Sequence, residues 1–336
     1  MIFPPSYIFF LLTLLLGSLI SISSSSWFGG WVGLELNIMS FIPLITLKIN
    51  SYFSEAALKY FLIQALGSAL FIYARCISVS FRDLIYTLTL FALLLKLAAA
   101  PFHFWFPQVA EGLHWPQMFI LSTIQKLAPI ILISYLTTNT ILIKIISISA
   151  ILSALIGAWG GFNLTSLRKI LAFSSINHIS WMLIAISIRD TFWLTYFIFY
   201  SIISLSVIAT FFSIQAFSLS IIIQSSQNTT LYTLIISLNI LSLGGLPPLS
   251  GFIPKWIILQ IIINTKLFFA LFFLLISALI TLYFYLRISI PFILISNPTI
   301  NFNIKSLTPT PVSTLLLIPV SFNFYRILLP LYSLLI

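Results

Sequence analysis

The sequence has 336 residues, of which 60% are hydrophobic and only 6% are charged. Soluble domains carry about 25% charged residues, and the mean hydropathy here is +1.17. The chain is therefore predicted to be an all-α polytopic membrane protein. A net charge of +10 would favour nucleic acid as the partner of a soluble protein, but these basic residues are scattered among apolar runs and form no cationic face. One cysteine, Cys76, excludes an internal disulfide framework and a Cys-based metal or iron–sulfur site.

Apolar stretches of about 20 residues, the length that crosses a bilayer as a helix, occur eleven times. They lie near residues 6–23, 28–47, 55–74, 84–102, 115–137, 140–160, 168–187, 192–216, 231–261, 267–289 and 312–334. The first of them is not preceded by the basic region of a secretory signal, so we expect it to be a retained span. The longest polar connections, 218–230 and 297–311, are short. A single transmembrane domain over 1–336 is therefore expected.

The fourth and ninth spans share a lysine close to proline. The fourth has Lys96 followed by Pro101, and the ninth has Lys255 among three prolines. Because proline removes a backbone hydrogen bond and breaks a helix, both spans are predicted to be broken helices. Interrupted spans at matching places in two halves point to an ion site in transporters built from inverted repeats. We predict two five-helix inverted repeats, about 1–138 and 139–290, with a C-terminal loop and span at 291–336.

Four charges fall well inside predicted spans: Glu35, Lys96, Lys126 and Lys255. A charge at the bilayer centre costs at least roughly 2.5–3.5 kcal/mol on insertion scales. Each of these charges is therefore expected to be paired with an opposite charge or to have a role in function. Loss of water disfavours the charged form of a lysine, which can then exchange a proton near neutral pH. Glu35 is either a structural salt-bridge partner or an electrostatic switch on a lysine. A lysine that snorkels from a misplaced span boundary is the competing interpretation, and it would have to hold for all three.

Histidines and aromatic residues add weaker signals. His178 lies in a Ser- and Asn-rich segment and is a candidate proton relay; the alternative is a neutral histidine bonded to those neighbours. His103, Glu111 and His114 flank the loop after the fourth span, but their spacing matches no metal-ligand pattern, so capping or loop anchoring is expected. The sequence contains no phosphate loop, dinucleotide fingerprint or nucleophilic triad, and we expect no metal or cofactor in this chain. The aromatic residues, 16% and mostly Phe, are expected to face lipid.

Four motifs spread over nearly the whole chain are specific in combination. They are Trp31-Val-Gly-Leu-Glu35-Leu-Asn37, Lys96-(x)4-Pro101-Phe-His103-Phe-Trp-Phe-Pro107, Gln125-Lys126-Leu-Ala-Pro129 and Gly244-Gly-Leu-Pro-Pro-Leu-Ser-Gly251-Phe-x-Pro254-Lys255-Trp256. Together they resemble the mitochondrial NADH dehydrogenase (ubiquinone) subunit 2 family, one of the antiporter-like families in the membrane arm of respiratory complex I. Eleven spans match the animal form of that family.

The resemblance implies a core subunit of the proton-translocating enzyme NADH:ubiquinone oxidoreductase. Glu35 would pair with Lys96, Lys126 would be the central lysine of the proton path, and Lys255 would be the terminal lysine near the exit side. NADH, FMN, iron–sulfur clusters and ubiquinone would be used in other subunits, because this chain would hold no redox centre or NADH site. Electron transfer there would drive proton movement here.

The resemblance also implies a location and partners. The chain would lie in the mitochondrial inner membrane as a multi-pass protein, with its N-terminus in the matrix and its C-terminus toward the intermembrane space. Charges in the loops do not decide this topology, because they divide almost equally between the two faces. Its partners would be lipids and other membrane-arm subunits, including neighbouring antiporter-like subunits, and not nucleic acid.

Two other functions fit parts of the sequence. A free-standing cation/proton antiporter subunit would share the buried lysines and broken helices, and co-purification with an NADH-oxidising complex separates the two. An inert membrane scaffold would leave three buried lysines and a single buried acid unexplained, although each buried charge is costly. Unchanged activity after neutralisation of all three lysines would favour the scaffold.

Overall fold

The computed structural model describes residues 5–46, 50–76, 82–137, 139–188, 191–224 and 230–294. Within these ranges the chain forms helices, and the only extended pairing is an isolated antiparallel bridge between Ser166 and Ser218. The helices are α1 (Pro5–Ser23), α2 (Trp27–Ile45), α3 (Ser51–Cys76), α4 (Arg82–Leu97), α5 (Trp105–Glu111), α6 (Trp115–Ser122), α7 (Ile124–Tyr135), α8 (Thr140–Gly161), α9 (Leu167–Ser187), α10 (Phe192–Ile214), α11 (Leu219–Gln224), α12 (Thr230–Gly244), α13 (Phe252–Asn264) and α14 (Phe268–Leu294).

Eight stretches of these helices are long and apolar enough to cross a membrane, which confirms a multi-pass, all-α protein. They coincide with eight of the predicted spans. Of the other three spans, 84–102 covers α4 and the turn after it, and 231–261 covers α12 and α13. The span at 312–334 and the loop at 297–311 lie outside the described residues, as do residues 225–229 of the other polar connection. A total of eleven spans therefore stays a prediction.

The predicted span 115–137 is divided, because α6 and α7 meet at Thr123 instead of forming one helix. The hydroxyl of Thr123 donates a hydrogen bond of 2.7 Å to the Phe119 carbonyl, and the Lys126 amide donates to the Thr123 carbonyl over three residues instead of four. Pro129, inside α7, has no N–H to donate to the Gln125 carbonyl, so this helix lacks a further backbone hydrogen bond. The helix is therefore irregular one turn before Lys126.

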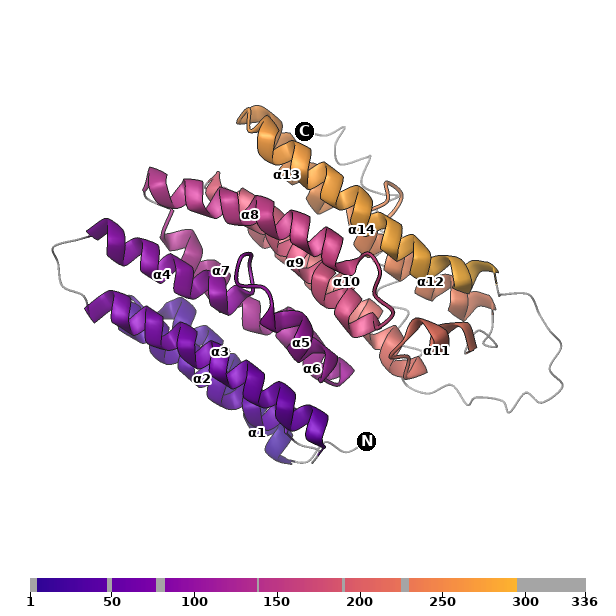
Figure 1. Ribbon diagram of the computed structural model, residues 1–336, viewed down its shortest axis with the longest axis horizontal. Coiled ribbons are helices and arrows are strands. Elements are labelled where there is room, and N and C mark those ends of the chain that lie inside the picture. Colours follow the sequence, from indigo (N-terminus) through magenta and orange to yellow (C-terminus); the bar gives the residue numbers. More distant parts are fainter. Residues whose placement is uncertain are drawn as a thin grey trace.

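Helix α9 is the centre of the bundle. It packs against α5, α6, α8, α10, α13 and α14, and 18 of its 21 residues are buried. Gly157 brings α8 close, because a Cβ there would lie 2.8 Å from the backbone nitrogen of Asn177; small residues allow such contact between membrane helices. In Figure 1, α1 to α3 lie on one side of α9 and α12 to α14 on the other. The polar residues of α9 from Ser174 onward are therefore enclosed.

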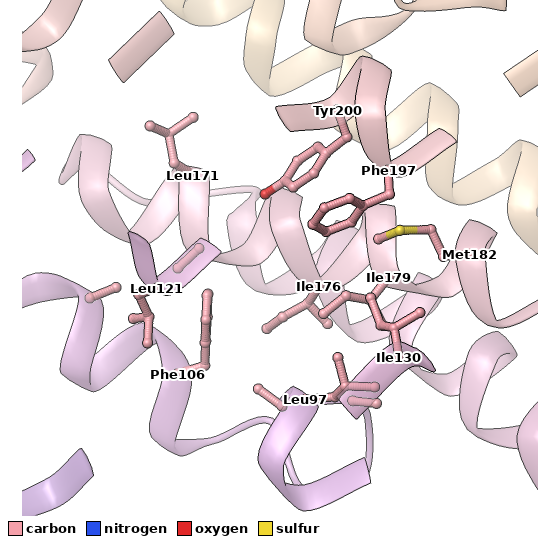
Figure 2. Close-up of a cluster of buried hydrophobic side chains, with 14 of the residues drawn as sticks. Leu97, Phe106, Leu121, Ile130, Leu171, Ile176, Ile179, Met182, Phe197 and Tyr200 are labelled. Atoms are coloured by element: carbon pink, nitrogen blue, oxygen red, sulfur yellow. The ribbon is translucent and has the colours of Figure 1, made fainter. Parts of the chain in front are cut away.

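One hydrophobic core joins the helices that precede α8 in the chain to the helices that follow it. Figure 2 shows side chains from the first group of helices packed with side chains from α9 and α10: Leu97, Phe106, Leu121 and Ile130 on one side, and Ile176, Ile179, Met182, Phe197 and Tyr200 on the other. This shared core holds the two groups of helices in a fixed relation, and it encloses the lysines that each group carries.

Candidate functional site

Lys126 is a cation buried without a carboxylate partner. It lies on α7 with 2% of its surface exposed, and its Nζ has no hydrogen-bond partner within the part of the chain that the structure describes. The Nζ atom lies 4.5 Å from the centre of the Phe106 ring, a distance at which the ring face attracts a cation. The charge is therefore held by an aromatic ring at an irregular point of the helix.

Lys96 lies in the last turn of α4, is 5% exposed, and its alkyl chain rests against Gly67 on α3. The helix ends at Leu97, before Pro101, because Ala98 adopts a left-handed conformation with φ of 59°. The Ala98 amide donates to the Leu95 carbonyl and the next amide to the carbonyl of Leu94, both at 3.1 Å. These two bonds form a Schellman motif, which usually has glycine at the left-handed position.

Two side chains also donate to carbonyls at this helix end. The indole N–H of Trp105 donates to the Leu95 carbonyl at 3.1 Å, and the amide of Gln64 donates to the Lys96 carbonyl at 3.4 Å. The Lys96 ammonium therefore does not cap its own helix, and in the described ranges its Nζ has no hydrogen-bond partner.

Glu35 and Lys96 form no direct ion pair among the described residues, so their expected pairing stays a prediction. Among the described residues, the ion pairs are Lys59–Glu55 and Lys169–Glu111, both at 2.6 Å. Oε2 of Glu35 is buried without a hydrogen-bond partner in the same ranges. Helix α3 packs against both α2 and α4, so it lies beside the helix that carries Glu35 and beside the helix that carries Lys96. The two charges still interact electrostatically, and Glu35 acts on Tyr60 in the same way.

Lys255 differs from the other two lysines because its ammonium is bonded to the backbone. It lies on α13, is 8% exposed, and donates a hydrogen bond of 2.7 Å to the carbonyl of Gly244, the last residue of α12. A helix C-terminus carries partial negative charge, so a cation is stabilised there. Gly245 follows with φ of 77°, and a Cβ on it would lie 2.9 Å from Cδ of Lys255. Glycine is needed for both reasons.

His178 lies on α9 and is 6% exposed. Its Nδ1 shares a hydrogen bond of 2.8 Å with the hydroxyl of Tyr196, and its ring centre lies 4.9 Å from that of Tyr200. Both Lys126 and Lys255 act on it electrostatically. His178 therefore interacts with one lysine that precedes α8 in the chain, Lys126, and one that follows it, Lys255. Its ring is bonded to a tyrosine of α10 and not to a Ser or Asn neighbour.

Sequence reasoning missed these aromatic partners. The expectation that aromatic residues face lipid is wrong for them and for the other aromatic residues of the buried core. Phe106, Tyr196 and Tyr200 are 1%, 1% and 5% exposed. The two tyrosines offered a signal, since residues four apart share one face of a helix; Phe106 offered none. His114 begins α6 as its N-cap residue, in line with the expected capping role.

The site thus has two groups of residues. Glu35, Tyr60 and Lys96 form one group, on α2 to α4. Lys126, His178 and Lys255 form the other, with Tyr196 and Tyr200 around the histidine. Enclosed cations near a histidine provide groups that can hold and exchange protons inside a membrane.

The helix bundle with its buried lysines belongs to the class of antiporter-like membrane proteins: the family model described as NADH:quinone oxidoreductase/Mrp antiporter, TM, matches residues 77–281. NADH-ubiquinone oxidoreductase chain 2 of Anopheles gambiae is 44% identical over 330 residues, which cover 95% of this chain and 94% of that relative. The protein of the same name from Balaenoptera musculus is 39% identical over 98% of this chain and 97% of its own length. The chain therefore belongs to the NADH-ubiquinone oxidoreductase chain 2 family, which confirms the resemblance carried by its motifs.

Solved structures share the fold. A chain of respiratory complex I from Thermus thermophilus with bound Aureothin superposes with a TM-score of 0.80 at 23% identity, over 97% of this chain and 78% of that one. A chain of the Mrp complex from Dietzia sp. DQ12-45-1b superposes with a TM-score of 0.71 at 17% identity, over 83% of this chain and 59% of that one. The same antiporter-like bundle therefore occurs in proteins of distant sequence.

Proposed function

We propose that the chain is a core membrane subunit of respiratory complex I and translocates protons across the mitochondrial inner membrane. The observation that carries the proposal is the burial of Lys96, Lys126 and Lys255, each at most 8% exposed, with His178 in electrostatic range of the last two. Moving one charge against a membrane potential costs about 2.3 kcal/mol per 100 mV, so the transfer has to be driven. Electron transfer from NADH to ubiquinone through the FMN and iron–sulfur clusters of other subunits supplies that energy, and this chain holds no redox centre.

Lys126 is the central proton-carrying group in this proposal. A lysine out of water with no contacting carboxylate gains little from keeping its charge, so it can release a proton when its surroundings change. Glu35 and Lys96 provide such a change, because a shift in their separation alters the charge that Lys126 experiences. The proton then passes toward Lys255 along water and polar side chains, with His178 as a relay.

The proposal includes a topology and partners. The chain has eleven spans in two inverted repeats of five, with interrupted helices at Lys96 and Lys255, and it begins in the matrix and ends toward the intermembrane space. A residue of positive φ next to each lysine, Ala98 and Gly245, supports the comparison of the two halves. Neighbouring membrane-arm subunits, including other antiporter-like subunits, and lipids cover the outer faces.

A free-standing antiporter is the alternative, and the fold shared with the Mrp complex chain is compatible with it. Curated relatives named as a chain of NADH-ubiquinone oxidoreductase favour the complex. Co-purification of the chain with NADH-oxidising activity would support the proposal, and isolation of a functional antiporter without that activity would contradict it.

Replacement of the central lysine tests the function. Lys126→Ala is expected to lower the initial rate of proton translocation by about tenfold or more, because a group that accepts and returns a proton is lost. The control is Lys144→Ala on α8, which removes an exposed lysine and is expected to leave the rate unchanged. Both variants are measured in assembled complex within vesicles, and NADH oxidation by an artificial electron acceptor reports the amount of complex. A normal rate in Lys126→Ala would contradict the proposal.

A further inference from the structure

Two tyrosines of α10 hold the imidazole of His178. Tyr196 shares a hydrogen bond of 2.8 Å with Nδ1, and the ring of Tyr200 lies against the imidazole with 4.9 Å between centres. The tyrosines are four residues apart and therefore lie on one face of the helix. Both are almost completely buried, so the imidazole is fixed in direction by one bond and in plane by one ring contact.

The bond at Nδ1 decides which nitrogen of His178 can exchange a proton. A neutral imidazole carries one N–H and one acceptor nitrogen, and a tyrosine hydroxyl can either donate or accept. If the Tyr196 oxygen accepts from Nδ1–H, then Nε2 has a lone pair. Nε2 can then take a proton, and the ring returns to its first state when Nε2 gives it up. A partner on one ring nitrogen sets the tautomer and orientation of a working histidine in this way.

A small cavity lies against Tyr200. Its volume is about 10 Å³, and three hydroxyl side chains line it with that tyrosine: Ser122, Ser174 and Ser204. This is close to the smallest space that holds one water. Ser122 ends α6 beside the junction that precedes Lys126, and Ser174 is one turn before His178 on α9. A water in this cavity would lie between α6 and α9, next to the junction that precedes Lys126 and one turn from His178.

We propose that Tyr196 is a positioning residue for proton transfer: its hydroxyl oxygen accepts from Nδ1–H of His178 and keeps Nε2 as the exchanging nitrogen between Lys126 and Lys255. The proton leaves the Lys126 ammonium, binds Nε2 directly or through the water beside Tyr200, and leaves Nε2 for the Lys255 amine. Nδ1 keeps its proton throughout, so each transfer is balanced. This inference rests on the proposed function, because it assigns His178 to the same path.

Removal of one hydroxyl tests the proposal. Tyr196→Phe keeps the ring and its packing but frees Nδ1, and the rate of proton translocation is expected to fall by about tenfold, with NADH oxidation by an artificial acceptor unchanged. The control is Tyr283→Phe on α14, which removes a hydroxyl from an exposed tyrosine and is expected to leave the rate unchanged. Rates are expressed per assembled complex, so a change in assembly alone does not alter the result.

A double-mutant comparison separates positioning from general packing. If Tyr196 acts through His178, then Tyr196→Phe causes no further loss in a His178→Gln background, whereas independent effects add. A full rate in Tyr196→Phe, or an additional tenfold loss in the double variant, would overturn the inference. If Lys126→Ala abolishes translocation while Tyr196→Phe does not affect it, the inference fails and the proposed function stands. A full rate in Lys126→Ala would overturn both.

Discussion

The end of α4 and the junction between α12 and α13 each place a lysine beside a residue of positive φ. The two sites differ in whether the ammonium is hydrogen-bonded to a helix-end carbonyl. At the first, the amides of Ala98 and Ala99 and the indole of Trp105 occupy the helix-end carbonyls, and in the described ranges the Lys96 ammonium has no hydrogen bond. At the second, the Lys255 ammonium itself bonds to the Gly244 carbonyl.

This difference in hydrogen bonding favours different roles for Lys96 and Lys255. An ammonium that is bonded to a helix terminus keeps its position and gains from the partial charge there. An ammonium without a bonded partner responds more strongly to a nearby charge, because little else stabilises it. Lys96 therefore suits a role as a sensor of Glu35, and Lys255 suits a role as a fixed end point.

The largest expected effect comes from filling the space beside Lys255. Gly245→Ala forces a side chain into a left-handed conformation, which costs about 1–2 kcal/mol, and its Cβ would lie 2.9 Å from Cδ of Lys255 and 3.1 Å from Nζ. The bond to the Gly244 carbonyl is expected to break, and both assembly on native gels and the rate of proton translocation are expected to fall.

The matching change at the first helix end is Ala98→Gly, at φ of 59°. It relieves strain at the left-handed position and is expected to leave assembly and translocation unchanged. Equal losses in both variants would show that the two helix ends do not differ in the way described.

A smaller effect is expected at the first helix end. Trp105→Phe removes the indole N–H that donates to the Leu95 carbonyl, and a hydrogen bond of this kind contributes about 1 kcal/mol. The Ala98 amide still donates to the same carbonyl, so the loss stays small. A decrease of a few degrees in the thermal inactivation midpoint of the complex, with translocation kept, is expected. Loss of translocation in this variant would mean that Trp105 controls the Lys96 charge directly.

The bilayer makes much of the fold readable from the sequence. About 20 apolar residues have to form a helix, since lipid satisfies no backbone group, and eight predicted spans are observed as helices of that kind. The divided helix at Thr123 was not predicted, because it depends on a side-chain hydroxyl bonding to its own backbone. The end of α4 at Leu97 was also not predicted, since alanine rarely adopts the left-handed conformation of Ala98.

The candidate site was readable only in part. Lys96, Lys126 and Lys255 were found because a buried charge is costly in any fold. The contact of Lys126 with Phe106 and the bond between His178 and Tyr196 join residues far apart in the chain or on different helices, and composition cannot reveal them. The distance between Glu35 and Lys96 is of the same kind, because it depends on how α3 packs between two neighbours.

The central claim is that Lys126 carries a proton and does not merely supply a fixed positive charge. Lys126→Arg separates the two, because a guanidinium keeps its charge but does not lose its proton in proteins. The measurement is the initial rate of NADH-driven proton translocation by vesicles containing the assembled complex. The account predicts a loss as severe as in Lys126→Ala. A full rate with arginine would contradict it and leave Lys126 as a fixed charge.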